Sequence, residues 1–303
     1  MYLEHFGLKE LPFTLTPNTH FFLNMASHHE AFNMLMVSIS NGEGFLKVVG
    51  EVGTGKTILC RKVLNTLSED EAHFDTAFIP NPILSPKGLF LAFAEELGIE
   101  LTPEIDHHTL LRNITQRLGE RAAQGRAVIL FIDEAHAMPE QTLEALRLLT
   151  NIETERAKLL QVVLFAQPEL DEVLNRLTLR QLRQRITFAF RLEALDDRGV
   201  ERYVSHRLAM AGYNGGELFT AKAMTLLSGA SRGVPRLVNI VAHKALMSAF
   251  GKGDRTVDVP HVKAAVLDTE GVEMPAVSLA PWLAVAAVLA IGAAALFFAK
   301  DYL

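Results

Sequence analysis

The stretch Gly50-Glu51-Val52-Gly53-Thr54-Gly55-Lys56-Thr57 has the spacing of a phosphate-binding loop: a glycine, four residues, then Gly, Lys and Thr. An apolar run at 45–49 precedes it, and apolar residues recur every four positions over 59–67 behind it. A glycine-rich loop between a strand and a helix turns its amides inward around phosphates. Lys56 adds a positive charge and Thr57 a Mg²⁺ ligand. The stretch therefore predicts a site for a nucleoside triphosphate with Mg²⁺.

A second candidate element is the apolar run 127–132, which ends in Asp133 and Glu134. It looks like a Walker B element, because ligands bind at the carboxyl ends of parallel strands. We expect Asp133 to hold Mg²⁺, directly or through water, and Glu134 to orient and deprotonate the attacking water. Alone, such an acidic pair is more often a helix cap, but its place after the phosphate loop favours catalysis.

The rest of the pattern predicts an α/β fold with a small all-α unit behind it. Nearly continuous apolar runs predict buried parallel strands, and amphipathic helices between them predict a doubly wound sheet. The further runs cover 76–79, 128–132, 162–166 and 187–190, and the helices 89–97, 110–123 and 141–152. The expected division is 1–194 nucleotide-binding domain, 195–268 helical domain, 269–279 linker and 280–299 transmembrane helix.

The bulk composition is that of a folded globular protein, with 49% hydrophobic and 21% charged residues. The net charge of −6 offers no basic excess to hold a nucleic acid. The lone Cys60 excludes an internal disulfide and is expected to be a buried apolar residue. Adjacent histidines at 28–29 and 107–108 diverge on a helix, so we expect solvated histidines and no metal site.

The carboxyl-terminal segment from Trp282 through Ala299 carries no charge or strongly polar group. A helix over it would span about 27 Å, close to the roughly 30 Å of a hydrocarbon core. We expect a single-pass inner-membrane anchor, with a buried helix in an oligomer interface as the alternative. Lys300 is the only nearby basic residue, so charge does not orient the segment. The nucleotide-binding part is placed in the cytoplasm, where ATP is.

Several motifs carry a family resemblance: the phosphate loop, 133–136, 165–170, 182–186, 233–236 and the opening 2–8 with 12–13 and 16–17. Together they resemble the AAA+ ATPases, in particular the group of ATPases of type II secretion and of mannose-sensitive haemagglutinin pilus biogenesis. The likeness covers roughly residues 1–268. It implies a five-stranded parallel sheet with a helical lid, ATP between them, a homo-oligomer, and envelope or pilus assembly proteins as partners. Related secretion proteins carry a peptidoglycan-binding part after their membrane helix; only four residues, 300–303, follow here, so cell-wall binding is not carried over.

The resemblance also assigns roles to three polar residues. Gln167 takes the place of a residue that senses the γ-phosphate, although a Gln before a turn proline is the alternative. Arg236, after Pro235 in the first turn of a helix, resembles the second sensor of the lid. Arg185 is favoured over Arg183 as an arginine finger reaching a neighbouring subunit.

Two competitors for the finger remain nearby, Arg176 and Arg180, and a solvated basic helix face is the alternative for all of them. The expected catalytic residues are Glu134, Lys56, Arg185, Gln167 and Arg236. The expected nucleotide contacts are Gly50, Glu51, Val52, Gly53, Thr54, Gly55, Lys56, Thr57, Ile58, Asp133 and Arg236, with Thr57 and Asp133 as metal ligands.

Other functions share these motifs. A DNA-associated ATPase of the transposition or replication-initiation kind has the same fold, but the net charge of −6 and the apolar tail argue against it. A helicase with an Asp-Glu-Ala-His box needs a second motor domain, for which the remaining residues are too few. A nucleotide-gated scaffold would bind ATP with little turnover. Measuring phosphate release by the purified protein distinguishes it from an ATPase.

Overall fold

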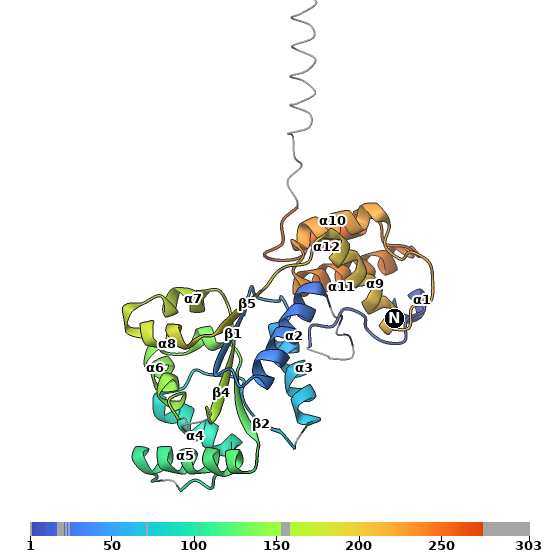
Figure 1. The fold of residues 1–303 in the computed structure, drawn as a ribbon. Helices are drawn as coiled ribbons and strands as arrows, with labels where there is room; N and C mark the ends of the chain where they lie inside the picture. The colour runs from blue at the N-terminus through green and yellow to red at the C-terminus, as the bar shows by residue number, and fades with distance from the viewer. Residues whose placement is uncertain are drawn as a thin grey trace, which may run out of the picture.

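A five-stranded parallel sheet forms the centre of the computed structural model, which describes residues 2–16, 21, 23, 25–70, 72–102, 104–152 and 158–274. The strand order is β2-β3-β4-β1-β5 (Figure 1). This confirms the expected α/β class. The strands are β1 (Phe45–Gly50), β2 (Phe74–Ile79), β3 (Ala127–Ile132), β4 (Leu160–Ala166) and β5 (Phe188–Leu192).

The strand register aligns the carboxyl ends of the three central strands. Val49 of β1 pairs with Ala166 of β4, and Ile132 of β3 pairs with Leu164 of β4. Because β1 lies beside β4 and not beside β2, the segments that follow β1, β3 and β4 meet at one edge. Ligands of open α/β sheets bind at such an edge.

Helices cover both faces of the sheet (Figure 1). On one face, α2 (Ala26–Ser40) and α3 (Lys56–Ser68) pack on alternate strand residues such as Phe131 and Phe165. The other face packs against α4 (Pro86–Glu96), α5 (His107–Ala123) and α6 (Glu140–Leu149). Burial on both faces explains why the strands lack a polar alternation.

Two short helices follow β4 before the last strand, α7 (Glu169–Leu174) and α8 (Arg180–Arg185). The helical lid comes after β5 and has its own core. Its helices are α9 (Asp197–Met210), α10 (Ala221–Ser231), α11 (Pro235–Lys252) and α12 (Val259–Leu267).

The amino-terminal residues pack with the lid. Tyr2 and Phe6 of α1 (Tyr2–Phe6), together with Phe13, are buried among the lid side chains, and the Tyr2 hydroxyl lies 3.0 Å from His243 Nδ1. The division expected from the sequence assigned these residues to the nucleotide-binding domain, 1–194. A short apolar segment carries no local signal for which of two cores it joins, so only the packing decides this.

The predicted membrane segment 280–299 lies outside the described residues, as does the linker from 275 onward. Within the part of the chain that the structure describes, no helix has both the length and the apolar character needed to cross a membrane.

Candidate functional site

The phosphate loop joins β1 to α3 and depends on two glycines with left-handed backbone. Gly53 has φ 83° and Gly55 φ 98°, conformations that side-chain-bearing residues adopt only with strain. The buried Lys56 ammonium donates to the carbonyl oxygens of Gly50 at 2.7 Å and Glu51 at 2.9 Å. Burial lowers the pKa of Lys56, an effect opposed by the carboxylates of Glu134 and Asp133. The loop thus holds a cation at the N-terminus of α3.

Thr57 and Asp133 form an oxygen pair beside this cation. The Thr57 hydroxyl donates to Asp133 Oδ2 at 2.8 Å, and the Glu134 amide donates to Asp133 Oδ1 at 2.9 Å. Burial raises the pKa of Asp133, while these two hydrogen bonds lower it. A hydroxyl and a carboxylate are the ligands that Mg²⁺ takes together with phosphate oxygens. The pair therefore fits the predicted metal position.

The third cluster consists of Glu134, Gln167 and His136. Gln167 Nε2 lies 3.4 Å from Glu134 Oε2 and 2.9 Å from His136 Nε2. His136 Nδ1 is in turn 3.4 Å from Glu134 Oε2. Glu134 has a left-handed backbone, with φ 53° and ψ 35°, which turns it off the end of β3. The structure brings together the expected base and sensor, and adds His136, to which the sequence reasoning gave no role.

The lid touches the phosphate loop at Arg236. Its backbone amide, at the start of α11, donates to the carbonyl oxygen of Gly53 at 3.2 Å. This bond satisfies a helix N-terminal amide that has no partner inside the helix. A Cβ added at Gly53 would lie 2.5 Å from Arg236 Cβ. The predicted second sensor is therefore in direct contact with the loop.

Arg185 lies apart from this group in the single chain. Its Nη1 donates to Thr150 Oγ1 at 2.9 Å, and Nη2 donates to Asn151. Arg183 Nη1 donates to Asn175 Oδ1 at 2.6 Å. Neither arginine lines the cavity at the phosphate loop. Neither Arg183 nor Arg185 is therefore positioned at the phosphate loop of its own chain.

A cavity of about 290 Å³ lies between the loop and the lid. Its lining contains most of the expected residues, and six that sequence reasoning missed: Thr14, Leu15, Thr16, Tyr203, Arg207 and Asn239. Arg207 joins the amino-terminal segment to α9, because it donates to the Pro12 carbonyl oxygen, to the Tyr203 hydroxyl at 2.9 Å and to Thr14 Oγ1 at 3.3 Å. Apart from Thr16, which belongs to the opening that carries the family resemblance, no local motif marks these residues, since they come from segments that are distant in the sequence.

His28 is a correction to the expectation of solvated histidines. Its side chain is only 5% exposed, and its Nε2 lies 2.9 Å from the carbonyl oxygen of Thr54. Burial lowers the pKa of His28. The residue supports the phosphate loop from α2, whereas His107 and His108 are exposed as expected. The sequence of α2 alone does not show which face meets the loop.

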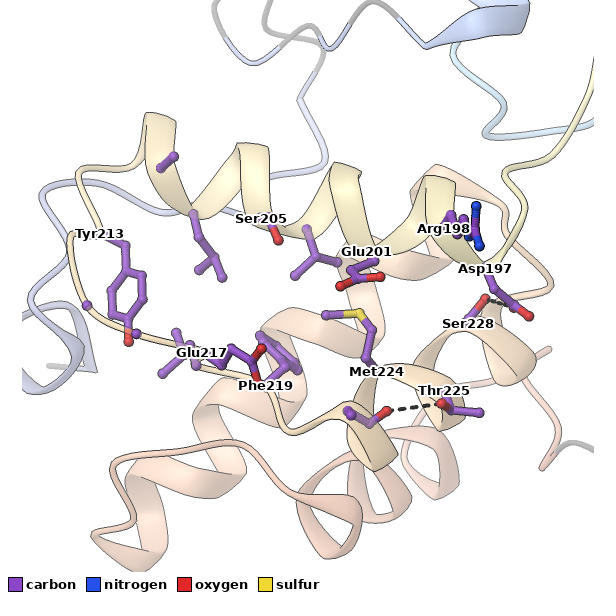
Figure 2. Close-up of a pocket in the computed structure, with 17 residues that line it drawn as sticks. Asp197, Arg198, Glu201, Ser205, Tyr213, Glu217, Phe219, Met224, Thr225 and Ser228 are labelled. Atoms are coloured by element: carbon purple, nitrogen blue, oxygen red, sulfur yellow. Dashed lines mark hydrogen bonds between the residues drawn. The ribbon is translucent and has the colours of Figure 1, made fainter.

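A second cavity, of about 530 Å³, lies within the lid between α9 and α10 (Figure 2). Figure 2 shows the side chains of Glu201 and Met224 directed toward each other, with Ser228 donating to Asp197 at 2.6 Å. Its lining includes three carboxylates, of Asp197, Glu201 and Glu217, against one guanidinium, of Arg198, and no residue of the phosphate loop. An excess of negative charge disfavours a triphosphate, so the cavity at the phosphate loop is the better candidate site despite its smaller volume.

The sheet order, the loop and the acidic strand end define a P-loop AAA+ fold with a helical lid. Residues 39–174 match a family model described as an AAA domain. The chain is similar to General secretion pathway protein A of Aeromonas hydrophila, with 37% identity over 272 residues. That match covers 90% of this chain and 49% of the relative, so the chain spans about half of the curated relative's length.

Solved structures share the fold. Cdc6p from Pyrobaculum aerophilum superposes with a TM-score of 0.66 at 15% identity, covering 82% of this chain and 70% of that one. Drosophila ORC bound to DNA gives a TM-score of 0.64 at 19% identity, with 85% and 64% covered. The Aeropyrum pernix ORC1 protein in complex with DNA gives 0.60 at 18%, with 85% and 69% covered. At these identities the likeness concerns the fold alone.

Proposed function

We propose that this chain is a Mg²⁺-dependent AAA+ ATPase. The observation that carries the proposal is the convergence of Lys56, the Thr57–Asp133 pair and the Glu134–Gln167 pair at one edge of the sheet. These residues follow three strands, β1, β3 and β4, and the three groups match separate requirements of phosphoryl transfer: charge on the phosphates, a metal ligand and a base for water.

The loop amides and the Lys56 ammonium would hold the β- and γ-phosphates, because the N–H dipoles and the positive charge both attract phosphate oxygens. Thr57 and Asp133 would hold Mg²⁺, which when bound neutralises charge on the phosphate oxygens. Glu134 would orient the attacking water and accept its proton. Gln167, whose Nε2 lies 3.4 Å from Glu134 Oε2, would contact the γ-phosphate.

Arg185 would act on the nucleotide of a neighbouring subunit, because it lies apart from the cavity of its own chain. A guanidinium supplied from a neighbour stabilises the charge that develops in the transition state. The proposal therefore includes a homo-oligomer. Arg183, which contacts Asn175 in its own chain, is the next candidate.

The cellular role we propose is assembly of an envelope machine, either a type II secretion system or a pilus of the mannose-sensitive haemagglutinin type. The printed name of the 37% identical relative, General secretion pathway protein A, supports the secretion branch. From the sequence we propose that 280–299 anchors the chain in the inner membrane, with the ATPase in the cytoplasm. A chain ended after Glu273 is then expected in the soluble fraction, and its retention on salt-washed membranes would show another anchor.

Two substitutions test the ATPase. Lys56→Ala should abolish tight ATP binding, whereas Glu134→Gln should keep binding and slow phosphate release by about 10²- to 10⁴-fold. Lys222→Ala, in the exposed first turn of α10, is the matched charge control and should change neither quantity. ATP binding by Lys56→Ala within threefold of the parent would refute the phosphate-loop assignment. Slow turnover by the parent itself would favour a nucleotide-gated scaffold.

DNA association remains an alternative outcome to be tested. The likeness to DNA-bound ORC structures concerns the fold alone, at 19% identity or less. The net charge of −6 does not favour phosphate-backbone binding. A salt-dependent gel shift at low micromolar protein would favour this alternative.

A further inference from the structure

The cavity between α9 and α10, which we call the lid cavity, has an apolar floor (Figure 2). Leu208 and Phe219 line it and are buried, and Tyr213 and Met224 line it and are half-buried. The volume of about 530 Å³ lies within the range of ligand pockets, about 300–1,000 Å³. A methionine side chain adapts to apolar partners of different shapes. The floor can therefore receive a large apolar side chain.

The rim of the lid cavity is acidic. Asp197, Glu201 and Glu217 are exposed there, against the one guanidinium of Arg198. The ion pairs found in the described part of the lid involve other residues. The excess of negative charge at the rim attracts a cationic group and repels an anionic one.

The lid cavity adjoins two further hollows. Glu201 and Ser205 also line a hollow of about 790 Å³. Tyr213 and Leu218 also line one of about 490 Å³. The hollows meet along α9, whose 14 residues make a helix about 21 Å long. This length suits a peptide segment better than a compact small molecule.

The lid cavity and the nucleotide cavity lie on different faces of α9. Tyr203 and Arg207, one turn apart, line the cavity at the phosphate loop. Glu201, Ser205 and Leu208 line the lid cavity. A ligand of the lid cavity therefore leaves the nucleotide position free.

We propose that the lid cavity is a docking site for a peptide segment of a partner protein, a segment that carries a large apolar side chain next to a Lys or Arg. The apolar side chain would enter between Phe219 and Met224, and the basic neighbour would lie against Glu201 and Glu217. Removal of the apolar side chain from water contributes affinity, and the carboxylates discriminate by charge. This inference goes beyond ATP hydrolysis, because it requires neither the phosphate loop nor a nucleotide.

The test measures the binding of short fluorescein-labelled peptides to the full chain, without nucleotide, by fluorescence anisotropy. Three sets of peptides of equal length combine Leu with Lys, Ser with Lys, and Leu with Glu. We expect the Leu–Lys set to contain the tightest binders. They should bind at least tenfold more tightly than the Ser–Lys set, because a buried Leu side chain is removed from water. The Leu–Glu set should bind more weakly still, because its carboxylates meet an acidic rim.

Ala209→Trp tests whether these peptides occupy the lid cavity. Ala209 is exposed on α9 and lines the cavity, so an indole can fill it without displacing a buried side chain. The substitution should weaken binding of the Leu–Lys peptides at least tenfold. Ala264→Trp is the matched control, since Ala264 is exposed on the lid helix α12 and does not line the cavity. It should leave binding unchanged.

The double substitution Glu201→Gln with Glu217→Gln tests the acidic rim. Exposed ion pairs contribute little each, so we expect binding of the Leu–Lys peptides to weaken about three- to fivefold at low salt. The difference should disappear at high salt, which screens exposed charges. Glu270→Gln is the matched control, because Glu270 is exposed and lies outside the cavity lining.

Three results would overturn the inference. The first is equal binding of the Leu–Lys and Ser–Lys peptides to the parent chain, and the second is binding that Ala209→Trp does not diminish. The third is a change in subunit number caused by Ala209→Trp in sedimentation, which would assign the cavity to contacts between copies of the chain. If Ala209→Trp does not fold, the double substitution at the exposed rim decides.

Lys56→Ala separates this inference from the proposed function. The variant should bind the Leu–Lys peptides like the parent, because Lys56 lines the cavity at the phosphate loop and not the lid cavity. Loss of peptide binding in Lys56→Ala would place the peptides at the phosphate loop and overturn the inference. Normal peptide binding by a chain that binds no ATP would overturn only the proposed function.

Discussion

Gly53→Ala should separate the phosphate loop from the lid. The new methyl group would lie 2.5 Å from Arg236 Cβ and 3.2 Å from Val234 Cγ1, and the backbone has φ +83°. A left-handed backbone costs an L-residue about 1–2 kcal/mol, partly offset by about 0.4–1 kcal/mol from a less flexible unfolded chain. Moving Arg236 also breaks the hydrogen bond from its backbone amide to the Gly53 carbonyl oxygen, which contributes about 0.5–1.5 kcal/mol.

Gly125→Ala is the matched control for this substitution. Gly125 has φ +76° and no atom within 4 Å of an added Cβ, so it has the backbone strain without the clash. From these contributions we expect a loss of about 1 kcal/mol for Gly125→Ala and about 2–3 kcal/mol for Gly53→Ala. Urea unfolding measures both.

ATP titration measures the functional consequence. Gly53→Ala should weaken ATP binding at least fivefold, because it displaces both the loop and Arg236, and Gly125→Ala should leave it within twofold. Equal unfolding free energies for the two variants, together with normal ATP affinity, would refute the contact between loop and lid as a determinant of the site.

Three other predictions concern single residues of the site. Arg185→Ala subunits mixed with Glu134→Gln subunits should regain phosphate release, because an intact base then meets an intact finger; mixed oligomers as inactive as either parent would exclude Arg185 as a finger in trans. Burial lowers the pKa of His28 from its ordinary 6.5. As the pH falls, the His28 imidazole is therefore protonated in the unfolded chain at a higher pH than in the folded one. The free energy of unfolding should consequently decrease as the pH drops below 6.5. His28→Leu should weaken the dependence of the unfolding free energy on pH, which urea titrations at several pH values measure. An unchanged dependence would show that other groups cause it. Thr57→Ala should raise the Mg²⁺ concentration needed for half-maximal turnover, and an unchanged requirement would remove Thr57 from the metal site.

The local sequence was sufficient to predict that the elements to which we assign the phosphate chemistry lie together. The loop around Lys56 has its own spacing, and Asp133 and Gln167 each directly follow an apolar strand. Parallel strands bring their carboxyl ends to one edge, so the proximity of these residues follows from the strand pattern and the fold class. The α/β class with a parallel sheet could also be predicted from the sequence, because continuous apolar strands alternate with amphipathic helices.

Packing between distant segments decided the rest of the site. His28 lies on a helix whose sequence does not say which face meets the loop, yet its ring is within hydrogen-bond distance of Thr54. Arg207 and Asn239 carry no motif, and they reach the cavity because the lid folds back over the loop and the amino-terminal segment packs on the lid. A sequence pattern records the periodicity of one element, whereas the wall of this cavity combines the amino-terminal segment, the edge of the sheet and the lid, whose relative positions depend on the tertiary structure.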